Sequence, residues 1–255
     1  MEQKTETISV VVPAYNCAPY LTDTLQSVLA QTVQPLEILV IDDHSDQETQ
    51  AILETFSHQE SKIHVYRNEE NRGVAYSRNR GVSLAKGDWI AFLDSDDQWA
   101  PEKLEKQLAM LKSKNGVFGF TGSAFMDESG QRYSGIFEVP ETVSQTELLR
   151  QNVISCSSVM IRRELMVRYP MKSDDIHEDF DAWLRILSEV PAAYGLNAPL
   201  LIYRLSPNSK SGNKLKSFRM NYKTYRSVGL SPWKATANMY WYTKNGLKKY
   251  KNIKK

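Results

Sequence analysis

Short apolar runs alternate with segments of helical spacing over the first 100 residues of the chain. The apolar runs cover residues 8–12, 36–42, 63–67 and 89–94. Helical spacing lies between them, at about residues 19–31, 47–56 and 73–85. Runs with so few polar positions are typical of strands that are buried on both faces. Strand–helix–strand repetition at this spacing predicts an α/β fold, with a mostly parallel sheet, right-handed crossovers and flanking helices.

The pattern in the second half of the chain is less regular. It predicts strands at residues 117–125 and 157–163, and helices at residues 144–151 and 178–190. From about residue 214 onward, the chain is expected to form helices that are rich in Tyr, Trp and Lys. No internal repeat or low-complexity linker separates these parts.

The small formal net charge of +2 hides a strong asymmetry along the chain. Residues 190–255 contain 14 Lys and Arg and no Asp or Glu, so this segment carries +14. Since the total is +2 and this segment contributes +14, the preceding residues carry −12. An acidic body with a basic end indicates an anionic partner for the basic part.

The remaining composition is that of an intracellular globular protein. The apolar fraction of 41% is enough for a substantial core. No run approaches the roughly 18 apolar residues that a spanning helix needs, and the polar N-terminus lacks the features of a signal peptide. We therefore expect the protein in the cytoplasm. Cys17 and Cys156 are isolated in sequence, which favours two free thiols over a disulfide.

The segment Leu93–Asp97 (LDSDD) is the sharpest chemical feature of the chain. It places three carboxylates within four positions, directly after a predicted buried strand. Carboxylates this close raise one another's pKa unless a cation or solvent screens them, and such oxygen ligands suit Mg²⁺ or Mn²⁺ bound together with phosphate. An Asp-rich turn before a helix that begins at Pro101 explains the same residues, so this segment alone leaves both interpretations open.

Two further polar segments also allow a functional and a structural interpretation. Asp42 and Asp43 follow the second predicted strand, where a carboxylate can bind a nucleobase or ribose, or cap the next helix. The segment NRGVAYSRNRG, residues 71–81, brings three arginines close to a helix start. That arrangement suits phosphate, but it also describes a solvated basic face.

The segment HEDFDAWLRI, residues 177–186, places Glu178 and Asp179 at the predicted N-terminus of a helix. The helix dipole favours their ionised form, and an ionised carboxylate that faces a cleft can take a proton from a hydroxyl group. Simple N-terminal capping is the alternative. His177 is expected to form local hydrogen bonds rather than to bind a metal ion.

Taken together, these segments resemble glycosyltransferase family 2, a large group with the GT-A fold. The resemblance covers about residues 8–211 and rests on five ordered motifs: SVVVPAYN, VIDDHS, NRGVAYSRNRG, FLDSDD and HEDFDAWLR. It implies a Rossmann-like GT-A catalytic domain at residues 1–212, with a nucleotide-binding half at about 1–98 and an acceptor half at about 99–212. A basic, aromatic and helical tail would follow at residues 213–255.

The resemblance also implies roles for the matched positions. Asp179, with Glu178 beside it, would be the general base that deprotonates the acceptor hydroxyl. Asp94, Asp96 and Asp97 would hold Mn²⁺ or Mg²⁺. The sugar donor would lie against a larger set of residues: Pro13, Tyr15, Asn16, Asp42, Asp43, Arg72, Gly73, Arg78, Asp94, Ser95, Asp96 and Arg204.

Two positions depart from the family pattern. Many relatives have His in a YR-x-H segment, where this chain has Ser206. Arg204 and the residues Ser209, Lys210 and Ser211 would then contact phosphate in its place. His44 stands where the family's DD-G-S element has glycine.

The sequence therefore predicts an inverting transferase that moves one sugar from a nucleoside-diphosphate sugar, by default a UDP-sugar, to a hydroxyl of a glycan or lipid-linked acceptor. The QxxRW signature of processive synthases is absent. The segments PEKLEKQL and ISCSSVMIRR resemble those of bacterial transferases for teichuronic acid and capsular polysaccharide. Two alternatives are a sugar-nucleotide nucleotidyltransferase, disfavoured because the turn PAYNCAPY lacks glycine, and a non-catalytic module that binds glycan or nucleic acid.

Aromatic and cationic residues interleave between Tyr222 and Tyr250. Such a surface suits anionic lipid headgroups, so we expect peripheral binding at the inner face of the cell membrane. Packing of these helices on the body, with the aromatic residues in the core, is the alternative. No recognised nucleic-acid motif accompanies the charge, and no nucleic-acid partner is expected.

Overall fold

The apolar runs of the first half form four neighbouring parallel strands in a computed structural model, which describes residues 6–206 and 214–249. These strands are β1 (Ile8–Ala14), β2 (Glu37–Asp42), β3 (Ile63–Arg67) and β4 (Trp89–Phe92). The crossover helices are α1 (Ala18–Leu29), α2 (Gln47–Gln59) and α3 (Val74–Leu84). The α/β fold expected from the hydrophobic pattern is confirmed, because β3, β2, β1 and β4 pair in parallel in that order.

The second half extends the same sheet with mixed pairing. It contributes β5 (Gln98–Trp99), β6 (Phe118–Met126), β7 (Arg132–Phe137), β8 (Thr142–Val143), β9 (Met160–Arg162) and β10 (Ala193–Arg204). In the described residues the sheet has ten strands in the order β3-β2-β1-β4-β9-β6-β10-β5, with β7 on β6 and β8 on β10. Antiparallel β9 joins β4 to β6 and so connects the two halves.

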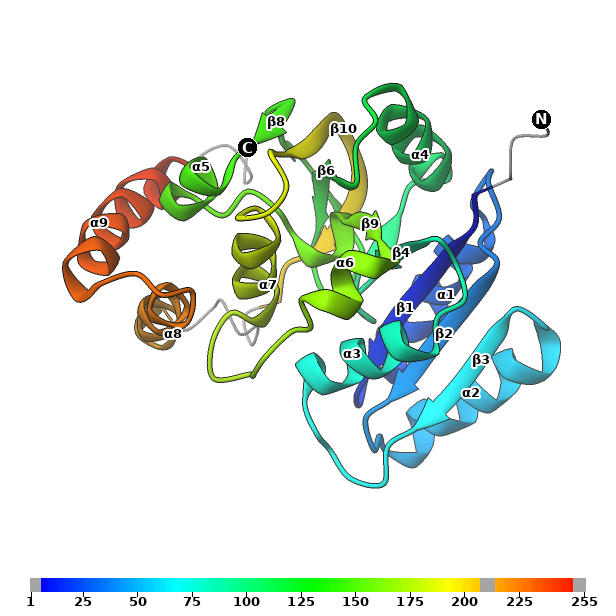
Figure 1. The fold of residues 1–255 in the computed structure, drawn as a ribbon. Coiled ribbons are helices and arrows are strands. Elements are labelled where there is room, and N and C mark those ends of the chain that lie inside the picture. The colour runs from blue at the N-terminus through cyan, green and yellow to red at the C-terminus, as the bar shows by residue number, and fades with distance from the viewer. Residues whose placement is uncertain (1–5, 207–213, 250–255) are drawn as a thin grey trace.

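Helices cover both faces of the sheet (Figure 1). The helices of the second half are α4 (Lys103–Ser113), α5 (Gln145–Arg150), α6 (Arg163–Arg168), α7 (Glu178–Ile186), α8 (Lys214–Ser227) and α9 (Pro232–Lys249). Apolar residues of α1, α2 and α4 form one core cluster with one face of the sheet, whereas α3, α5, α6 and α7 belong to the cluster on the other face. Val11 faces the second cluster and its neighbours Val10 and Val12 face the first, so both faces of β1 are buried.

The last two helices pack on the body. Tyr225 of α8 and Ala235 and Met239 of α9 are buried in the same cluster as α7. Phe180 of α7 meets the Tyr225 ring at a centroid distance of 5.9 Å and the Tyr242 ring at 6.1 Å. Part of the aromatic content of the tail is therefore core, as the packing alternative proposed.

Two local expectations are corrected by the structure. The predicted strand at residues 157–163 is a 3₁₀ turn, η1 (Cys156–Ser158), followed by the shorter β9. At its polar start, Ser157 Oγ accepts from Asp94 N and Ser158 Oγ donates to Ser155 O in the same turn, so these residues do not continue the strand. The helix predicted to reach Val190 ends at Ile186 and continues as turns, in which Val190 N donates to Ile186 O (3.0 Å).

None of the helices within residues 6–206 and 214–249 combines the length and the apolar character needed to span a membrane.

Candidate active site

The polar turns that follow β1, β2 and β4 meet at one edge of the sheet. These turns are residues 13–16, 42–45 and 94–97. Ala14 and Asp42 lie in register at the ends of β1 and β2, and Asp43 N donates to Ala14 O at 2.8 Å. Strand β4 pairs with the other side of β1. The three turns thus lie at the carboxyl ends of parallel strands, where ligands bind in such sheets.

Neighbouring elements fix the backbone of the loop after β4. Asp94 N donates to Ser157 Oγ of η1 at 3.0 Å. Thr24 Oγ1 of α1 lies within hydrogen-bonding distance of two carbonyl oxygens, those of Ser95 (3.0 Å) and Asp97 (2.8 Å). Sequence reasoning missed both supporting hydroxyls. For Ser157, the local signal in the sequence was the run of polar residues that interrupts an apolar pattern there.

Asp94 and Asp96 present partly exposed carboxylates at this loop. Burial and the neighbouring charge of Asp94 raise the pKa of Asp96 to about 6. A carboxyl group whose pKa is raised by burial and by a neighbouring carboxylate fits a divalent cation, because the cation favours its charged form. Within the described ranges, no group of three or more His, Cys, Asp or Glu is placed to hold a metal ion. A cation at Asp94 and Asp96 would therefore need further oxygen ligands, from a diphosphate or water.

Asp97 differs from the other two carboxylates of the segment. Its side chain is buried, and Oδ1 accepts a hydrogen bond from Arg204 N at 2.9 Å. Burial, followed by the charges of Asp96 and Asp94, raises the pKa of Asp97 well above its ordinary value. The carboxylate thus ties the loop to β10, a contact that the sequence did not predict.

Arg204, expected at the donor phosphate, donates to backbone carbonyls instead. Its side chain is buried, with Nε 2.8 Å from Asp96 O and Nη1 3.1 Å from both Asp127 O and Glu128 O. Its guanidinium carbon lies 4.4 Å from the ring centroid of Tyr20. In this arrangement Arg204 holds the loop after β4 against the turn between β6 and β7.

Arg78 joins the two acidic motifs. Its buried guanidinium donates through Nη2 to Asp94 Oδ1 (2.5 Å) and through Nη1 to Glu178 Oε1 (2.9 Å). Burial alone would lower the pKa of Arg78, but neighbouring negative charges, Asp94 foremost, raise it well above its ordinary value. The charged guanidinium of Arg78 thereby links the loop after β4 to the start of α7. Arg78 and Glu178 are 100 residues apart in sequence.

The first turn of α7 carries Glu178 and Asp179. Glu178 is buried against Arg78, whereas Asp179 is partly exposed. Burial, followed by the charge of Glu178, raises the pKa of Asp179. The hydrogen bonds of His177 were expected to be local, but they reach α8: its backbone N donates to Thr224 Oγ1 at 3.1 Å, and its ring Nε2 lies 3.4 Å from Ser217 O.

Protein carboxylates bind backbone amides directly before α3 and in its first turn, where the sequence left a phosphate site open. The Asp43 carboxylate accepts from Arg72 N (2.9 Å) and Gly73 N (2.8 Å). Asp174 Oδ1 accepts from Ala75 N at 3.1 Å. Gly73 has φ 84°, and a Cβ there would meet Asp174 Oδ2 at 1.7 Å. Glycine is thus needed for the close approach of Asp174.

The turn after β2 is held by its own carboxylate and by a left-handed residue. Asp42 is buried, and its Oδ1 accepts from Ser45 N at 2.8 Å. His44 has φ 67°, which explains why the corresponding position of the DD-G-S element suits glycine. Asn16 Oδ1 in the turn after β1 accepts from Asp46 N at 2.9 Å and joins the two turns. Tyr15 in the same turn is 51% exposed and free to meet a planar ligand.

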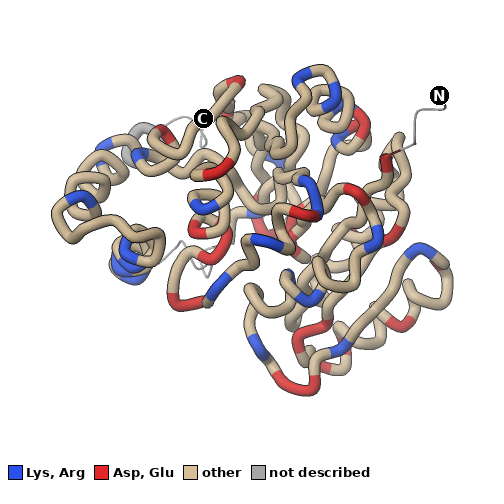
Figure 2. The backbone as a smooth tube through the Cα atoms, in the orientation of Figure 1, with Lys and Arg blue, Asp and Glu red and all other residues tan. Residues whose placement is uncertain are grey.

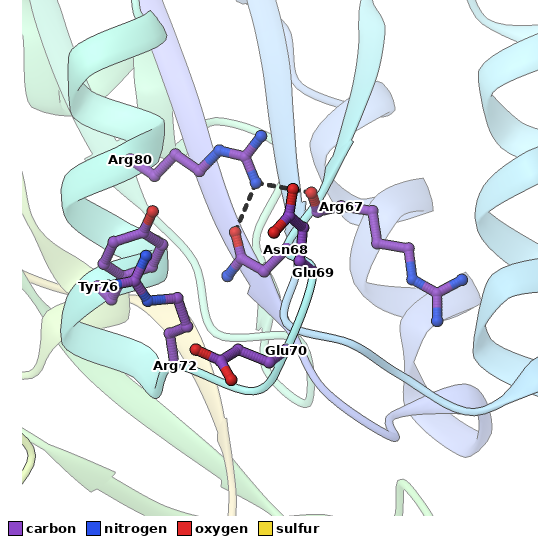
Figure 3. Close-up of a pocket in the computed structure, with 7 residues that line it drawn as sticks. All are labelled: Arg67, Asn68, Glu69, Glu70, Arg72, Tyr76 and Arg80. Carbon is purple, nitrogen blue, oxygen red and sulfur yellow. Dashed lines mark hydrogen bonds between the residues drawn. The ribbon is translucent and has the colours of Figure 1, made fainter.

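A pocket beside α3 is lined by two of the three arginines of residues 71–81, Arg72 and Arg80, but not by Arg78 (Figure 3). Its lining residues are Arg67, Asn68, Glu69, Glu70, Arg72, Tyr76 and Arg80. Arg72 stacks on Tyr76 at 3.9 Å, and Arg80 Nη1 donates to Asn68 Oδ1 at 2.5 Å. The structure thus brings only Arg78 to the acidic motifs.

The remaining expected donor residues fall into two groups. Pro13 lies in β1, and Ser95 lies between the two aspartates of the loop after β4. Ser209, Lys210 and Ser211 lie outside the described residues.

Comparison with known proteins assigns the chain to a family of enzymes. Residues 9–168 match the family model described as glycosyl transferase family 2. The chain is 37% identical over 243 residues to the putative teichuronic acid biosynthesis glycosyltransferase TuaG of Bacillus subtilis, covering 95% of this chain and 96% of that protein. It is 31% identical over 245 residues to the UDP-Glc:alpha-D-GlcNAc-diphosphoundecaprenol beta-1,3-glucosyltransferase WfaP of Escherichia coli, covering 96% of each.

Solved structures share the fold at low sequence identity. Staphylococcus aureus TarS in complex with UDP superposes with a TM-score of 0.71 at 19% identity, covering 95% of this chain and 72% of that one. The mannosyltransferase PcManGT of Pyrobaculum calidifontis, in complex with GDP-Man and Mn²⁺, superposes with a TM-score of 0.70 at 16% identity, covering 94% and 69%. At these identities the likeness establishes the fold alone.

Proposed function

The chain belongs to glycosyltransferase family 2, and we propose on that basis that it transfers a single sugar from a nucleoside-diphosphate sugar to a lipid-linked glycan with inversion of configuration. That it is a glycosyltransferase related to enzymes of cell-surface polysaccharide biosynthesis follows from the family and the relatives. UDP is the proposed carrier, because the name of WfaP specifies UDP-Glc and TarS binds UDP. The acceptor proposal rests on the diphosphoundecaprenol acceptor in the name of WfaP.

The proposed donor site lies at the ends of β1, β2 and β4. Tyr15 offers an exposed ring for the base, and the turn that carries Asp42 borders the same edge. Asp94 and Asp96 would hold Mn²⁺ or Mg²⁺, which when bound stabilises the negative charge of the departing nucleoside diphosphate. Asp97 and Arg204, which bind the loop after β4, are proposed to position that loop.

Asp179 is the proposed general base. Burial and the charge of Glu178 raise its pKa, which makes it a stronger base than an ordinary aspartate, and the nearby positive charge of Arg78 opposes part of that rise. The ionised carboxylate would take the proton of the acceptor hydroxyl as its oxygen attacks the anomeric carbon opposite the leaving diphosphate. One displacement of this kind inverts the configuration. The observation that carries the proposal is the Arg78 bridge, because it holds the donor loop and the base-bearing helix together.

Two carboxylate substitutions test these roles separately. We expect Asp96→Ala to abolish Mn²⁺-dependent binding of UDP, measured by calorimetry, and transfer with it. We expect Asp179→Asn to keep donor binding but to lose transfer by about a hundredfold or more, the usual contribution of general base catalysis. Glu54→Gln, at an exposed position of α2, is the matched control and should change neither quantity.

Each role has its own contrary result. Full transfer in Asp96→Ala, or in wild-type protein with EDTA, would refute the metal role. Loss of UDP binding in Asp179→Asn would make Asp179 a structural residue instead of the base. The enzyme is further proposed to act in the cytoplasm, at the inner face of the membrane that holds its acceptor.

A further inference from the structure

Helix α8 carries a row of cations on its outer face. Lys216, Arg219, Lys223 and Arg226 are all exposed, and their spacing of three and four residues places them on one side of the helix. Among residues 6–206 and 214–249, no salt bridge joins Arg219, Lys223 or Arg226 to a carboxylate. Figure 2 shows Lys and Arg, and no Asp or Glu, along α8 and α9, in keeping with the absence of acidic residues after Glu189.

Helix α9 carries large aromatic residues on its outer face. Trp233 is 86% exposed, Tyr240 64% and Trp241 43%. Lys244 follows one turn later on the same face, with Nζ 5.1 Å from the Trp241 ring centroid. Amphipathic Trp and Tyr rings beside Lys are the composition that is enriched where proteins meet a lipid headgroup layer.

The opposite sides of these two helices are anchored in the body. Met220 and Tyr225 of α8, and Ala235 and Met239 of α9, are buried. The Tyr225 hydroxyl also donates to Leu149 O at 2.7 Å. The exposed rows are therefore held outward by a fixed core, and not merely displayed by a loose tail.

The same helices touch the segment that carries the proposed base. Thr224 of α8 accepts a hydrogen bond from the backbone of His177, the residue directly before Glu178 and Asp179. Tyr225 packs edge-on against Phe180 of α7. A surface that bound α8 and α9 would thus fix the orientation of the first turn of α7 with respect to that surface.

We propose that the outer faces of α8 and α9 form a docking surface for an anionic phospholipid bilayer. We name it the tail surface and define it by Lys216, Arg219, Lys223, Arg226, Trp233, Tyr240, Trp241 and Lys244. The cations meet the negative headgroups and the rings enter the interface. The inference rests on the proposed function in one respect: a lipid-linked acceptor gives the docking its purpose.

Vesicle sedimentation of the full chain tests the proposal. Wild-type protein is expected to bind vesicles that contain phosphatidylglycerol, to bind vesicles of phosphatidylcholine alone far more weakly, and to dissociate in high salt. The triple variant Arg219→Gln, Lys223→Gln, Arg226→Gln should bind phosphatidylglycerol vesicles on the order of a hundredfold more weakly, since each cation near such a surface contributes about fivefold. Trp233→Ser with Trp241→Ser should also weaken binding to these vesicles at low salt, because the rings no longer enter the interface.

A charge-matched control separates the tail surface from net charge. Lys86, Lys106 and Lys114 are exposed positions outside α8 and α9, and their triple replacement by Gln removes the same three charges. This control should bind vesicles like wild type, and circular dichroism should show the same melting for all variants. Equal binding by the α8 variant and wild type, or equal loss in the control, would overturn the proposal. So would displacement of bound vesicles by poly(U) RNA at matched charge concentration, which would assign the surface to nucleic acid.

Transfer to a water-soluble acceptor analogue distinguishes this proposal from the proposed function. The tail-surface variants should keep wild-type transfer to the soluble analogue while losing vesicle binding. If wild type binds anionic vesicles but transfers no sugar to either a lipid-linked or a water-soluble acceptor, the proposed function fails and the docking surface stands. If transfer is normal and vesicle binding is absent, the docking surface fails alone.

Discussion

Arg78 shows how one residue can take a different role from the one that its motif suggests. The sequence groups it with Arg72 and Arg80, but helical geometry points Arg78 into the protein and the other two toward the pocket of Figure 3. Its guanidinium fork matches two carboxylates at once, those of Asp94 and Glu178. A buried cation with two such partners holds both carboxylates in place. Removing the guanidinium would leave the negative charges of Asp94 and Glu178 without this partner.

Replacement of Arg78 by Lys tests that bridging role. Lysine keeps the positive charge but cannot donate in parallel to Asp94 and Glu178. We expect kcat/KM for transfer to fall about tenfold to a hundredfold, the equivalent of one lost charged hydrogen bond. Steady-state kinetics and a thermal melt should show this loss without unfolding. Unchanged kcat/KM would mean that charge alone, and not the bridge, is required.

Lys103 is a second residue whose surroundings set its chemistry. Its side chain is fully buried, with Nζ 4.0 Å from the Trp99 ring centroid and 2.9 Å from Gln107 Oε1. Burial lowers the pKa of Lys103 from 10.5 to about 7. Between these values the unfolded chain holds a proton that the folded chain lacks, so the free energy of unfolding should rise with pH.

The pH dependence of unfolding should therefore change in Lys103→Met. In wild type this residue adds a slope of up to about 1.4 kcal/mol per pH unit between about pH 7 and pH 10. Urea unfolding of Lys103→Met across that range should lack this contribution, whatever its stability at any one pH. Lys106→Met, at an exposed position of the same helix, should keep the wild-type slope. Parallel profiles for wild type and Lys103→Met would contradict the lowered pKa.

At the scale of elements, the N-terminus of α3 is closed by protein carboxylates. The sequence left open either a phosphate site or a solvated basic face there, because arginines lie close to the helix start. In the structure, Asp43 from the end of β2 and Asp174 from the loop before α7 take these amides. The helix end therefore joins the two halves of the molecule, since Asp174 belongs to the second half.

Two glycines separate backbone strain from the crowding at this helix end. Gly73 and Gly229 both have positive φ, 84° and 86°, but only at Gly73 would a Cβ meet another atom, Asp174 Oδ2 at 1.7 Å. Alanine at either position should cost about 1–2 kcal/mol for the left-handed backbone. We expect Gly73→Ala to lose at least about 1 kcal/mol more than Gly229→Ala in urea unfolding, because Asp174 must move. Equal losses would show that the Asp174 contact does not stabilise the fold.

At the scale of the whole molecule, the basic C-terminal helices belong to the body and also face outward. Tyr225 and Met239 of the expected tail, residues 213–255, lie in a core cluster that also contains residues of the expected domain, residues 1–212. The division into domain and tail is therefore kept only as a proposal about function. Each helix is buried on one side, whereas the outer side of α8 carries cations and that of α9 carries aromatic rings. Of the two alternatives that the sequence left open, packing on the body is observed for the inner faces of these helices, and membrane binding is proposed for their outer faces.

The sequence by itself determined the α/β fold of the first half. Continuous apolar strands and helical spacing are local patterns, and strand order then follows from short right-handed crossovers. It also pointed to the five family motifs, because these are local strings. The sequence did not predict less regular elements such as β10. This strand contains Gly195, Asn197 and Pro199, and its register with β6 shifts there.

Only the tertiary structure decided which side chains share the site. Arg78 and Glu178, or Asp97 and Arg204, are about a hundred residues apart, and nothing in their spacing says that they meet. Which face of α3 or α9 is buried likewise depends on what packs against it. Local propensity acts over a few residues, whereas the carboxylate and guanidinium pairs of this enzyme exist only after the two halves of the sheet have joined.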